Sequence, residues 1–291
     1  MNEDESYWHQ QIHNIMPDLD IRSLKLHREG LVNDVLIVNN QWVFRFAKTE
    51  WGKEQMALEG ELMKFLGSRL PIDIPSPEIV LEDVIVYPLL IGEEFRREVW
   101  QEADEPSKQS YGDQLGGFLR ELHGVDLDSL HLEIPPTLAP VTRETWEEIY
   151  DRVVDNVYPH LLPHQVDWVE TLFKNALINP DFFKFDPVPV HGDLALYHIL
   201  YSPKKNKITG VIDFGVVGLG DPATDLGSLI NCYGETLVKK MGNTYPEMEN
   251  LMPRARFYAQ AIELQWALLG IESGDYYWFT AHIGGARDIH F

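Results

Sequence analysis

Four ionisable side chains lie at or beside the ends of two apolar runs in the second half of the chain. The runs are HGDLALYHIL and ITGVIDFG, and the side chains are His191, Asp193, His198 and Asp213. Ionisable groups beside a buried segment cost free energy unless they are paired, hydrogen-bonded or bound to a metal. Because the turn SPKKNK between the runs reverses the chain, we expect Asp193, His198 and Asp213 to converge on one point.

Two kinds of reaction use such a cluster. A metal hydrolase would use all four side chains as ligands around a water nucleophile. A phosphoryl-transfer site would use one carboxylate to orient an alcohol and accept its proton, and the other, with a neighbouring side chain, to hold Mg²⁺ on the nucleotide phosphates. The spacing favours phosphoryl transfer, because His198 follows Asp193 by five positions and Asp213 begins an Asp-Phe-Gly sequence.

Three motifs in order carry a resemblance to a known family. VHGDLALYHIL is similar to the H-G-D-x-x-x-x-N catalytic loop of the aminoglycoside phosphotransferase family, with His198 in the place usually held by Asn. IDFG resembles the metal-binding motif of that family, and GDPATDLGSL resembles the G-D-P-x-x-D-L-A sequence that follows it. Together the three motifs are a specific signal. With His at this place, the motif resembles that of the subgroups that act on the 2″-hydroxyl of aminoglycosides and on macrolides.

The resemblance implies the α+β, bilobal fold of the protein kinases. Residues 1–92 would form a small β-rich lobe that binds the nucleotide, and residues 93–291 a larger, mostly helical lobe for catalysis and the acceptor. The sequence pattern agrees, since three β-type runs between residues 22 and 47 predict an antiparallel meander and KEQMALEGELMKFLG predicts a helix. Helical periodicity recurs in SYGDQLGGFLRELHGVD and across residues 143–160, 165–177 and 252–272.

The resemblance also implies roles for the clustered residues. Asp193 would be the catalytic base that positions the substrate hydroxyl, and His198 and Asp213 would hold Mg²⁺. Asp225 would brace the catalytic loop by accepting hydrogen bonds from backbone N–H groups. His191 would be structural and would pack beneath the metal-binding loop.

A kinase-like enzyme also needs a cation on the nucleotide phosphates. Arg45 occupies the position where a kinase has Lys, and Glu59 of the following helix is its expected partner. The alternation in WVFRF leaves open a solvent-facing Arg45 on an exposed strand. The turn over the phosphates would contain Gly30. The base would lie against the backbone of the connection between the lobes, at Tyr87, Pro88, Leu89 and Leu90.

The acceptor is expected to be a small cationic molecule, in this family most often an antibiotic sugar. The C-terminal helices combine acids with aromatic residues, and the candidate contacts are Glu263, Glu272 and Asp275. Such a surface suits an amino sugar, although single acids on a helix are commonly just solvated. A macrolide, choline or homoserine would also fit. A catalytically silent nucleotide-binding module is the alternative from another class, and the intact Asp193 and Asp213 argue against it.

The charge of the chain limits its partners. It has 46 Asp and Glu against 24 Lys and Arg, a net charge of −22, which disfavours nucleic acid and anionic membranes. No run reaches the roughly 18 apolar residues that span a bilayer, and MNEDESYWHQ lacks the apolar core of a signal peptide. The single cysteine, Cys232, excludes an internal disulfide. The expectation is a cytoplasmic monomer that uses Mg²⁺ and either ATP or GTP.

Overall fold

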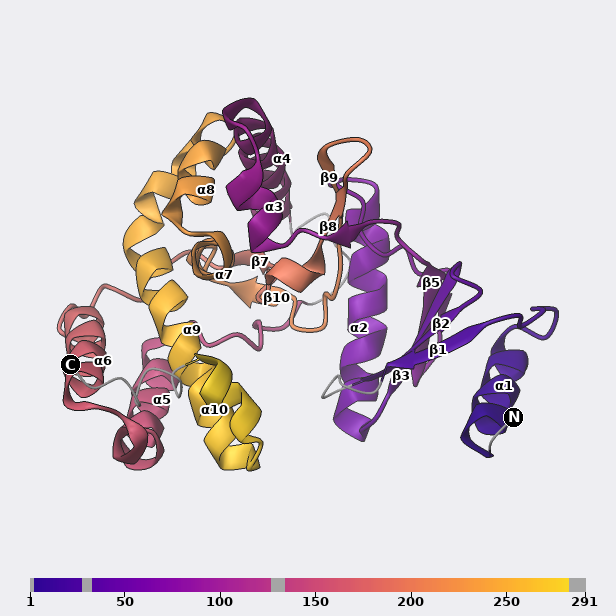
Figure 1. The fold of residues 1–291 in the computed structure, drawn as a ribbon, viewed down its shortest axis with the longest axis horizontal. Coiled ribbons are helices and arrows are strands. Elements are labelled where there is room, and N and C mark those ends of the chain that lie inside the picture. Colours follow the sequence, from indigo (N-terminus) through magenta and orange to yellow (C-terminus); the bar gives the residue numbers. More distant parts are fainter. Residues whose placement is uncertain (1–2, 28–32, 127–133, 283–291) are drawn as a thin grey trace. The chain divides into compact units, whose positions relative to one another are not determined.

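The chain forms two compact units (Figure 1). The computed structural model describes residues 3–27, 33–126 and 134–282 of the 291 residues. One unit comprises Met1–Ser68 and Ile74–Leu90, and the other comprises Arg69–Asp73 and Ile91–Phe291. The sequence did not predict that a short segment before residue 74 belongs to the second unit. It does so because Asp73 pairs with Gly210 and its carbonyl accepts a 2.9 Å hydrogen bond from the N–H of Val211.

The described part of the first unit is built on an antiparallel sheet of five strands in the order β1-β2-β3-β5-β4. The strands are β1 (Leu24–His27), β2 (Asn33–Val38), β3 (Trp42–Ala47), β4 (Ile79–Val80) and β5 (Val84–Pro88). The helices are α1 (Glu3–Ile15) and α2 (Glu50–Gly67). The predicted meander and the helix after it are confirmed. Helix α1 was not predicted from the sequence. It buries only Trp8 and Ile12, and two such positions make a weak helical pattern.

Both faces of β3 are covered. Trp8 of α1 packs on one face, where its ring lies 5.1 Å from that of Phe46, in a cluster that includes Phe44. Successive side chains of a strand point to opposite faces, so Arg45 lies on the other face, where it pairs with Glu59 of α2. Only 5% of Arg45 is exposed. The solvent-facing alternative for Arg45 is therefore wrong.

The described part of the second unit is mostly helical. Its helices are α3 (Arg97–Glu102), α4 (Glu105–His123), α5 (Arg143–Asn156), α6 (Pro163–Leu177), α7 (Ala223–Tyr233), α8 (Glu235–Lys240), α9 (Met252–Ser273) and α10 (Tyr276–His282). Its strands are β6 (Glu93–Glu94), β7 (Val188–Val190), β8 (Ile199–Ser202), β9 (Lys207–Val211) and β10 (Gly218–Gly220). They form a sheet in the order β6-β8-β9 and a ladder of β10 with β7. The helices predicted across residues 143–160, 165–177 and 252–272 are confirmed.

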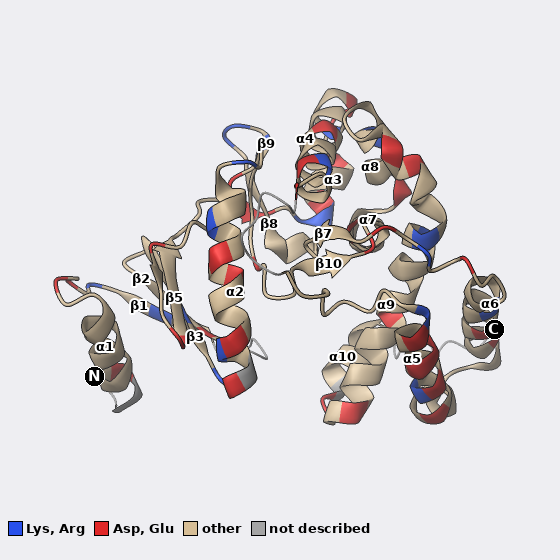
Figure 2. Ribbon diagram, turned by 180° about the vertical axis from the view of Figure 1, so that it is seen from behind, with Lys and Arg blue, Asp and Glu red and all other residues tan. Residues whose placement is uncertain are grey.

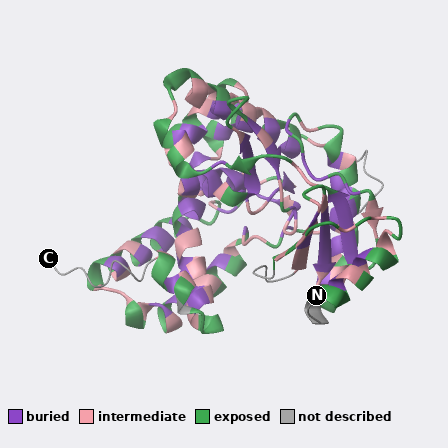
Figure 3. Cartoon of the chain, turned by 45° about the vertical axis from the view of Figure 1, so that its right-hand side comes forward, coloured by how far each residue is buried: buried purple, intermediate pink, exposed green. Residues whose placement is uncertain are grey.

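The core of the second unit lies where α7 meets α9. A Cβ atom at Gly227 of α7 would lie 2.7 Å from the Cβ of Tyr258 of α9, so only glycine allows the two helices to approach this closely. The buried residues, purple in Figure 3, run through the sheet of the first unit and the interior of the second. The tight packing of α7 fixes Asp225, a residue of its first turn.

Acidic residues are visible on several helices in Figure 2. On α5 they are Glu144, Glu147, Glu148, Asp151 and Asp155. Like charges on this scale repel a polyanionic partner. In the described residues, every helix is too short or too polar to cross a membrane.

Candidate active site

The loop between β7 and β8 presents Asp193. Gly192 has a φ of +82°, a left-handed conformation that other L residues rarely adopt. A Cβ atom at this position would also lie 2.9 Å from the hydroxyl oxygen of Thr137. After Asp193 the chain forms a 3-10 turn, η3 (Leu196–His198), and enters β8. The side chain of Asp193 keeps 33% of its surface exposed, so a ligand can reach the carboxylate.

The antiparallel pair of β8 and β9 brings Asp213 back to His198. Just after β9, the N–H of Ile212 donates to the carbonyl oxygen of His198 over 2.9 Å. Nε2 of His198 lies 3.3 Å from Oδ2 of Asp213, and its Nδ1 lies 3.7 Å from Oδ2 of Asp193. The three side chains that the sequence predicts to converge are therefore neighbours.

The ring of His198 has a defined orientation. Its Nδ1 lies 2.8 Å from the carbonyl oxygen of Asp193, and because a carbonyl only accepts, Nδ1 carries a proton. In the neutral ring, Nε2 then presents a lone pair to the Asp213 carboxylate. Burial lowers the pKa of His198, but the hydrogen bond to Asp213 and the charges of Asp213 and Asp193 outweigh burial and raise it. A positive charge between Nε2 of His198 and Oδ2 of Asp213 stabilises the two side chains, whether a proton or a metal cation supplies it. The two atoms therefore fit a metal cation.

A metal at this point needs further ligands from outside the protein. Within the described ranges, no group of three or more His, Cys, Asp or Glu side chains is arranged to hold a metal ion. The four-ligand site of a metal hydrolase is therefore not formed there. Mg²⁺ commonly binds through one or two carboxylates, several waters and substrate phosphates, although imidazole is a less common ligand for it than oxygen. Asp213 with His198 fits a cation that is shared with phosphate oxygens.

His191 is completely buried, and both ring nitrogens contact the protein. Its Nε2 donates to the carbonyl oxygen of Ile212 over 3.1 Å, and its Nδ1 accepts from the N–H of Asp193 over 3.3 Å. The ring meets that of Phe214 edge to face at 4.8 Å. Burial lowers the pKa of His191, so the ring is neutral near pH 7. His191 thus joins the catalytic loop to the Asp-Phe-Gly segment and leaves no nitrogen for a metal.

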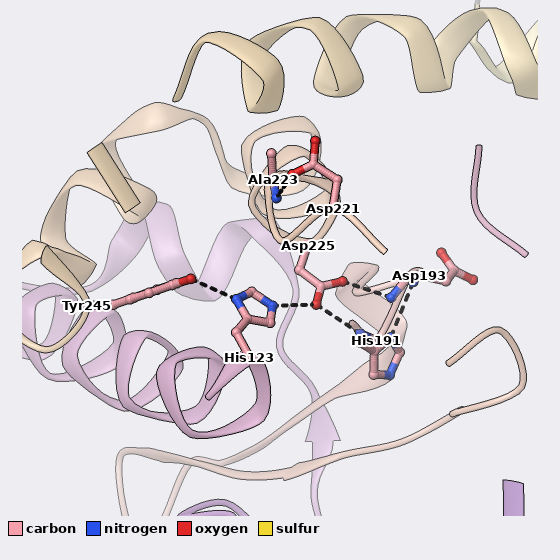
Figure 4. A network of polar contacts seen from close by, with 8 residues as sticks. His123, His191, Asp193, Asp221, Ala223, Asp225 and Tyr245 are labelled. Carbon is pink, nitrogen blue, oxygen red and sulfur yellow. Dashed lines mark hydrogen bonds and ion pairs between the residues drawn. The ribbon is translucent and has the colours of Figure 1, made fainter. Parts of the chain in front are cut away.

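Asp225 anchors the backbone of the loop that carries Asp193. Its Oδ2 accepts from the N–H of His191 at 2.9 Å, and its Oδ1 accepts from the N–H of Gly192 at 2.8 Å (Figure 4). Burial raises the pKa of Asp225, but the hydrogen bond and charge of His123, with those of His191, lower it overall. In Figure 4 the Asp193 carboxylate points away from this network. The loop is fixed on one side, and Asp193 faces the other.

Two further residues extend this network, and the sequence did not point to either. His123, the last residue of α4, places Nε2 3.1 Å from Oδ2 of Asp225, and its Nδ1 lies 2.9 Å from the hydroxyl of Tyr245. Burial raises the pKa of Tyr245, so the phenol stays protonated and donates to Nδ1, while Nε2–H donates to the carboxylate. His123 is 102 positions from Asp225 in the chain, and no spacing pattern links them.

Asp221 has a larger role than the helix cap that its position suggests. It is completely buried and accepts from the N–H of Ala223 at 2.9 Å. It also accepts from the hydroxyl of Tyr258 at 2.9 Å and from both Nε and Nη2 of Arg254, the latter at 3.0 Å. Asp221 therefore joins the start of α7 to α9. The signal available in the sequence is Arg254, a cation near the start of α9.

In the first unit, Arg45 and Glu59 form a buried ion pair, with Nη1 of Arg45 donating to Oε1 of Glu59. Only 4% of Glu59 is exposed. A buried charge pair of this kind holds the guanidinium in one orientation. Gly30, expected in the turn over the phosphates, lies outside the described residues.

The segment expected to contact the nucleotide base has few available backbone groups. Tyr87 is buried and pairs with Val43 in the sheet. The N–H of Leu89 donates to the carbonyl oxygen of Gln41 over 2.7 Å, and Pro88 has no N–H. The N–H of Leu89 is therefore not available to a base. The carbonyls of Pro88 and Leu89 and the backbone of Leu90 stay the predicted contacts.

The three acids expected to contact the acceptor have protein partners. Glu263 accepts from Asn231 at 2.7 Å and pairs with Nδ1 of His282 at 2.8 Å. Both oxygens of Glu272 accept from the guanidinium of Arg152. Asp275 accepts from the N–H of Tyr277 at 3.2 Å, within the first turn of α10. Each of the three acids therefore has its own partner within the protein, and their contact with an acceptor stays a prediction.

The sequence and the fold both match known proteins. Residues 23–258 match the model of the phosphotransferase enzyme family. The uncharacterized protein YcbJ of Bacillus subtilis (strain 168) is 25% identical over 218 residues, which cover 71% of this chain and 68% of YcbJ.

Two solved structures show the same fold. The GDP and kanamycin complex of APH(2″)-IIia has a TM-score of 0.84 at 22% identity and covers 97% of this chain and 99% of its own. Macrolide 2′-phosphotransferase MphH from Brachybacterium faecium has a TM-score of 0.70 at 21% identity, with 97% and 98% covered. The α+β, kinase-like fold predicted from the sequence is confirmed.

Proposed function

Because this chain belongs to the phosphotransferase enzyme family and is a phosphotransferase that acts on an alcohol group, we propose that it transfers the γ-phosphoryl group of ATP or GTP to a hydroxyl of a small cationic molecule. An aminoglycoside is the favoured acceptor, and a macrolide is the next. The aminoglycoside is supported by the likeness in fold to a protein that binds GDP and kanamycin.

The observation that carries this proposal is the meeting of Asp193, His198 and Asp213 at one point on a braced loop. The Asp193 carboxylate is one-third exposed and faces away from the buried network, and the Asp213 carboxylate is about half exposed and lies 3.3 Å from Nε2 of His198. A silent nucleotide-binding module has no chemical need for a second, exposed carboxylate at this place.

Asp193 would orient the acceptor hydroxyl and accept its proton as the oxygen attacks. The acceptor oxygen forms a bond to the γ-phosphorus, the bond from that phosphorus to the β,γ-bridging oxygen breaks, and the nucleoside diphosphate leaves. The proton passes from Asp193 to solvent. The hydrogen bonds that the loop N–H groups of His191 and Gly192 donate to Asp225 would hold Asp193 in place through these steps.

Asp213 and Nε2 of His198 would hold Mg²⁺, which when bound neutralises charge on the phosphates. His191 keeps the Asp-Phe-Gly segment beside the catalytic loop. Arg45 would contact the α- and β-phosphates, and Glu59 would fix its guanidinium. The base would meet the carbonyls of Pro88 and Leu89 and the backbone of Leu90. A cytoplasmic location, a monomeric state and the lack of a nucleic-acid or membrane partner remain predictions.

The test is nucleoside diphosphate release with Mg²⁺ and either ATP or GTP. The acceptors scanned are kanamycin, gentamicin, a macrolide, choline and homoserine, with the Asp193→Asn variant as the blank. We expect one acceptor class to stimulate release in the native protein only. Nucleotide binding without stimulation by any of them contradicts the proposed acceptors and favours the silent module. Release without nucleotide specificity or acceptor contradicts phosphoryl transfer.

A further inference from the structure

A cavity of about 40 Å³ lies beside the catalytic loop, among α5, α7 and α9. Buried side chains form its floor, and half-buried residues form its rim. The floor comprises Trp146, Thr224, Ser228 and Tyr258, and the rim includes Gly192 and Gln265. By the same measure one water molecule needs about 10 to 15 Å³. The cavity therefore accepts about three waters or one small functional group.

Two of the floor residues carry a polar atom that lacks a protein partner. Four buried side-chain atoms in the described parts of the chain have no hydrogen-bond partner, and two of them, Nε1 of Trp146 and Oγ1 of Thr224, belong to residues that line this one cavity. Trp146 is 1% exposed and Thr224 is 8% exposed. A buried polar group without a partner destabilises the native state. Both groups are therefore suited to bond something other than the protein.

The lining selects for neutral oxygen. Trp146 Nε1–H can only donate, whereas the Thr224 hydroxyl can donate or accept. The hydroxyl of Tyr258 already donates to Asp221 over 2.9 Å. None of the residues that line the cavity is charged. A hydroxyl or carbonyl oxygen would accept from Trp146 and bond with Thr224, whereas an ammonium would face an N–H donor.

Gly192 borders the cavity and directly precedes Asp193 in the chain, so the cavity adjoins the loop on which Asp193 would receive the acceptor hydroxyl. We infer that this cavity is an acceptor subsite that takes a small neutral hydroxyl- or carbonyl-bearing group. This inference rests on the proposed function, because that function identifies the ligand as the acceptor. It favours acceptors with several hydroxyls over choline, whose one hydroxyl would be at Asp193, and over homoserine, whose other groups are charged.

The indole N–H of Trp146 reports on this subsite directly. Its ¹H–¹⁵N signal is assigned by its loss in Trp146→Phe, with Trp168→Phe as the matched control, since Trp168 Nε1 already donates to Gln260 over 3.1 Å. Kanamycin, a macrolide and choline are titrated separately. We expect kanamycin or the macrolide to shift the Trp146 signal and choline to leave it in place. A signal that none of the three probes moves overturns the subsite.

Thr224→Val tests the same site without changing side-chain volume. We expect the dissociation constant of the probe that shifts Trp146 to rise about threefold to tenfold. The melting temperature should not fall, because the hydroxyl that is removed has no protein partner. Thr171→Val on α6 is the control, since Thr171 donates to the carbonyl of Asp167 over 2.8 Å. Unchanged probe affinity in Thr224→Val means that the cavity holds water only and overturns the inference.

Nucleoside diphosphate release in the same samples separates the two proposals. Stimulated release with an unmoved Trp146 signal leaves the proposed function standing and removes the subsite. A shifted signal without release supports the subsite and contradicts phosphoryl transfer to that probe.

Discussion

The catalytic loop and the C-terminal helices α9 and α10 both place acids beside aromatic rings, yet they hold those acids differently. Asp225 is completely buried and accepts from two backbone N–H groups and one imidazole. Glu272 is about one-third exposed and pairs with the half-exposed side chain of Arg152. Backbone donors and a buried ring fix a carboxylate in one position, whereas a surface pair constrains it weakly.

This difference indicates which acids we expect to take part in catalysis. Motifs with fixed spacing mark these acids, because Asp193 and Asp213 lie beside His198 and the loop N–H groups donate to Asp225, all within residues 191–225. The acids of α9 follow no such spacing, and the partners of Glu263 and Glu272 come from other elements. We expect substitutions to have large effects in the first region and small effects in the second.

Asp193→Asn should have the largest effect. The amide cannot accept the acceptor proton, so we expect turnover to fall by about 10²- to 10⁴-fold. Because the side chain is one-third exposed and lies outside the buried network, nucleotide affinity and melting temperature should hardly change. Steady-state kinetics and nucleotide titration check this. Native turnover in Asp193→Asn would remove Asp193 from the mechanism.

Asp193 could be predicted from the sequence because its neighbours in the site are close to it in the chain. His198 and Asp213 meet Asp193 because one tight turn joins two paired strands, and short-range spacing records that geometry. His123 and Tyr245 were missed because His123 lies 102 positions from Asp225 and 122 positions from Tyr245 in the chain. In the same way, the partner of Glu272 lies 120 positions away, so the sequence indicated an available acid where the structure has an ion pair.

His123→Leu should have the next largest effect. It removes a donor from the buried Asp225 carboxylate and leaves the Tyr245 hydroxyl unpaired, so we expect a loss of about 2 kcal/mol in the free energy of unfolding. A small displacement of the loop should also lower kcat by about 10- to 100-fold. Urea unfolding and kinetics measure the two effects.

His123→Gln is the matched variant, because its amide N–H can still donate to Asp225. Most of the kcat should return in it. If His123→Leu loses stability but keeps native kcat, the network supports the fold only and the loop does not depend on it for position.

Glu263→Gln should have the smallest effect, and its dependence on pH distinguishes charge from packing. Burial raises the pKa of Glu263, but hydrogen bonds from His282 and Asn231 and the charges of His282 and Arg97 lower it overall. A carboxyl with a lowered folded pKa stabilises the fold above its unfolded value of 4.5, and this contribution is lost as the pH falls through the folded value. We therefore expect Glu263→Gln to lower the melting temperature by about 2 °C at pH 7, and the difference from the native protein to shrink below pH 4.5. Glu272→Gln, on the surface, should change it less. If Glu263→Gln lowers the melting temperature equally at pH 7 and below pH 4.5, Glu263 acts through packing and not through its charge. This C-terminal acid would then be held as firmly as those of the catalytic loop.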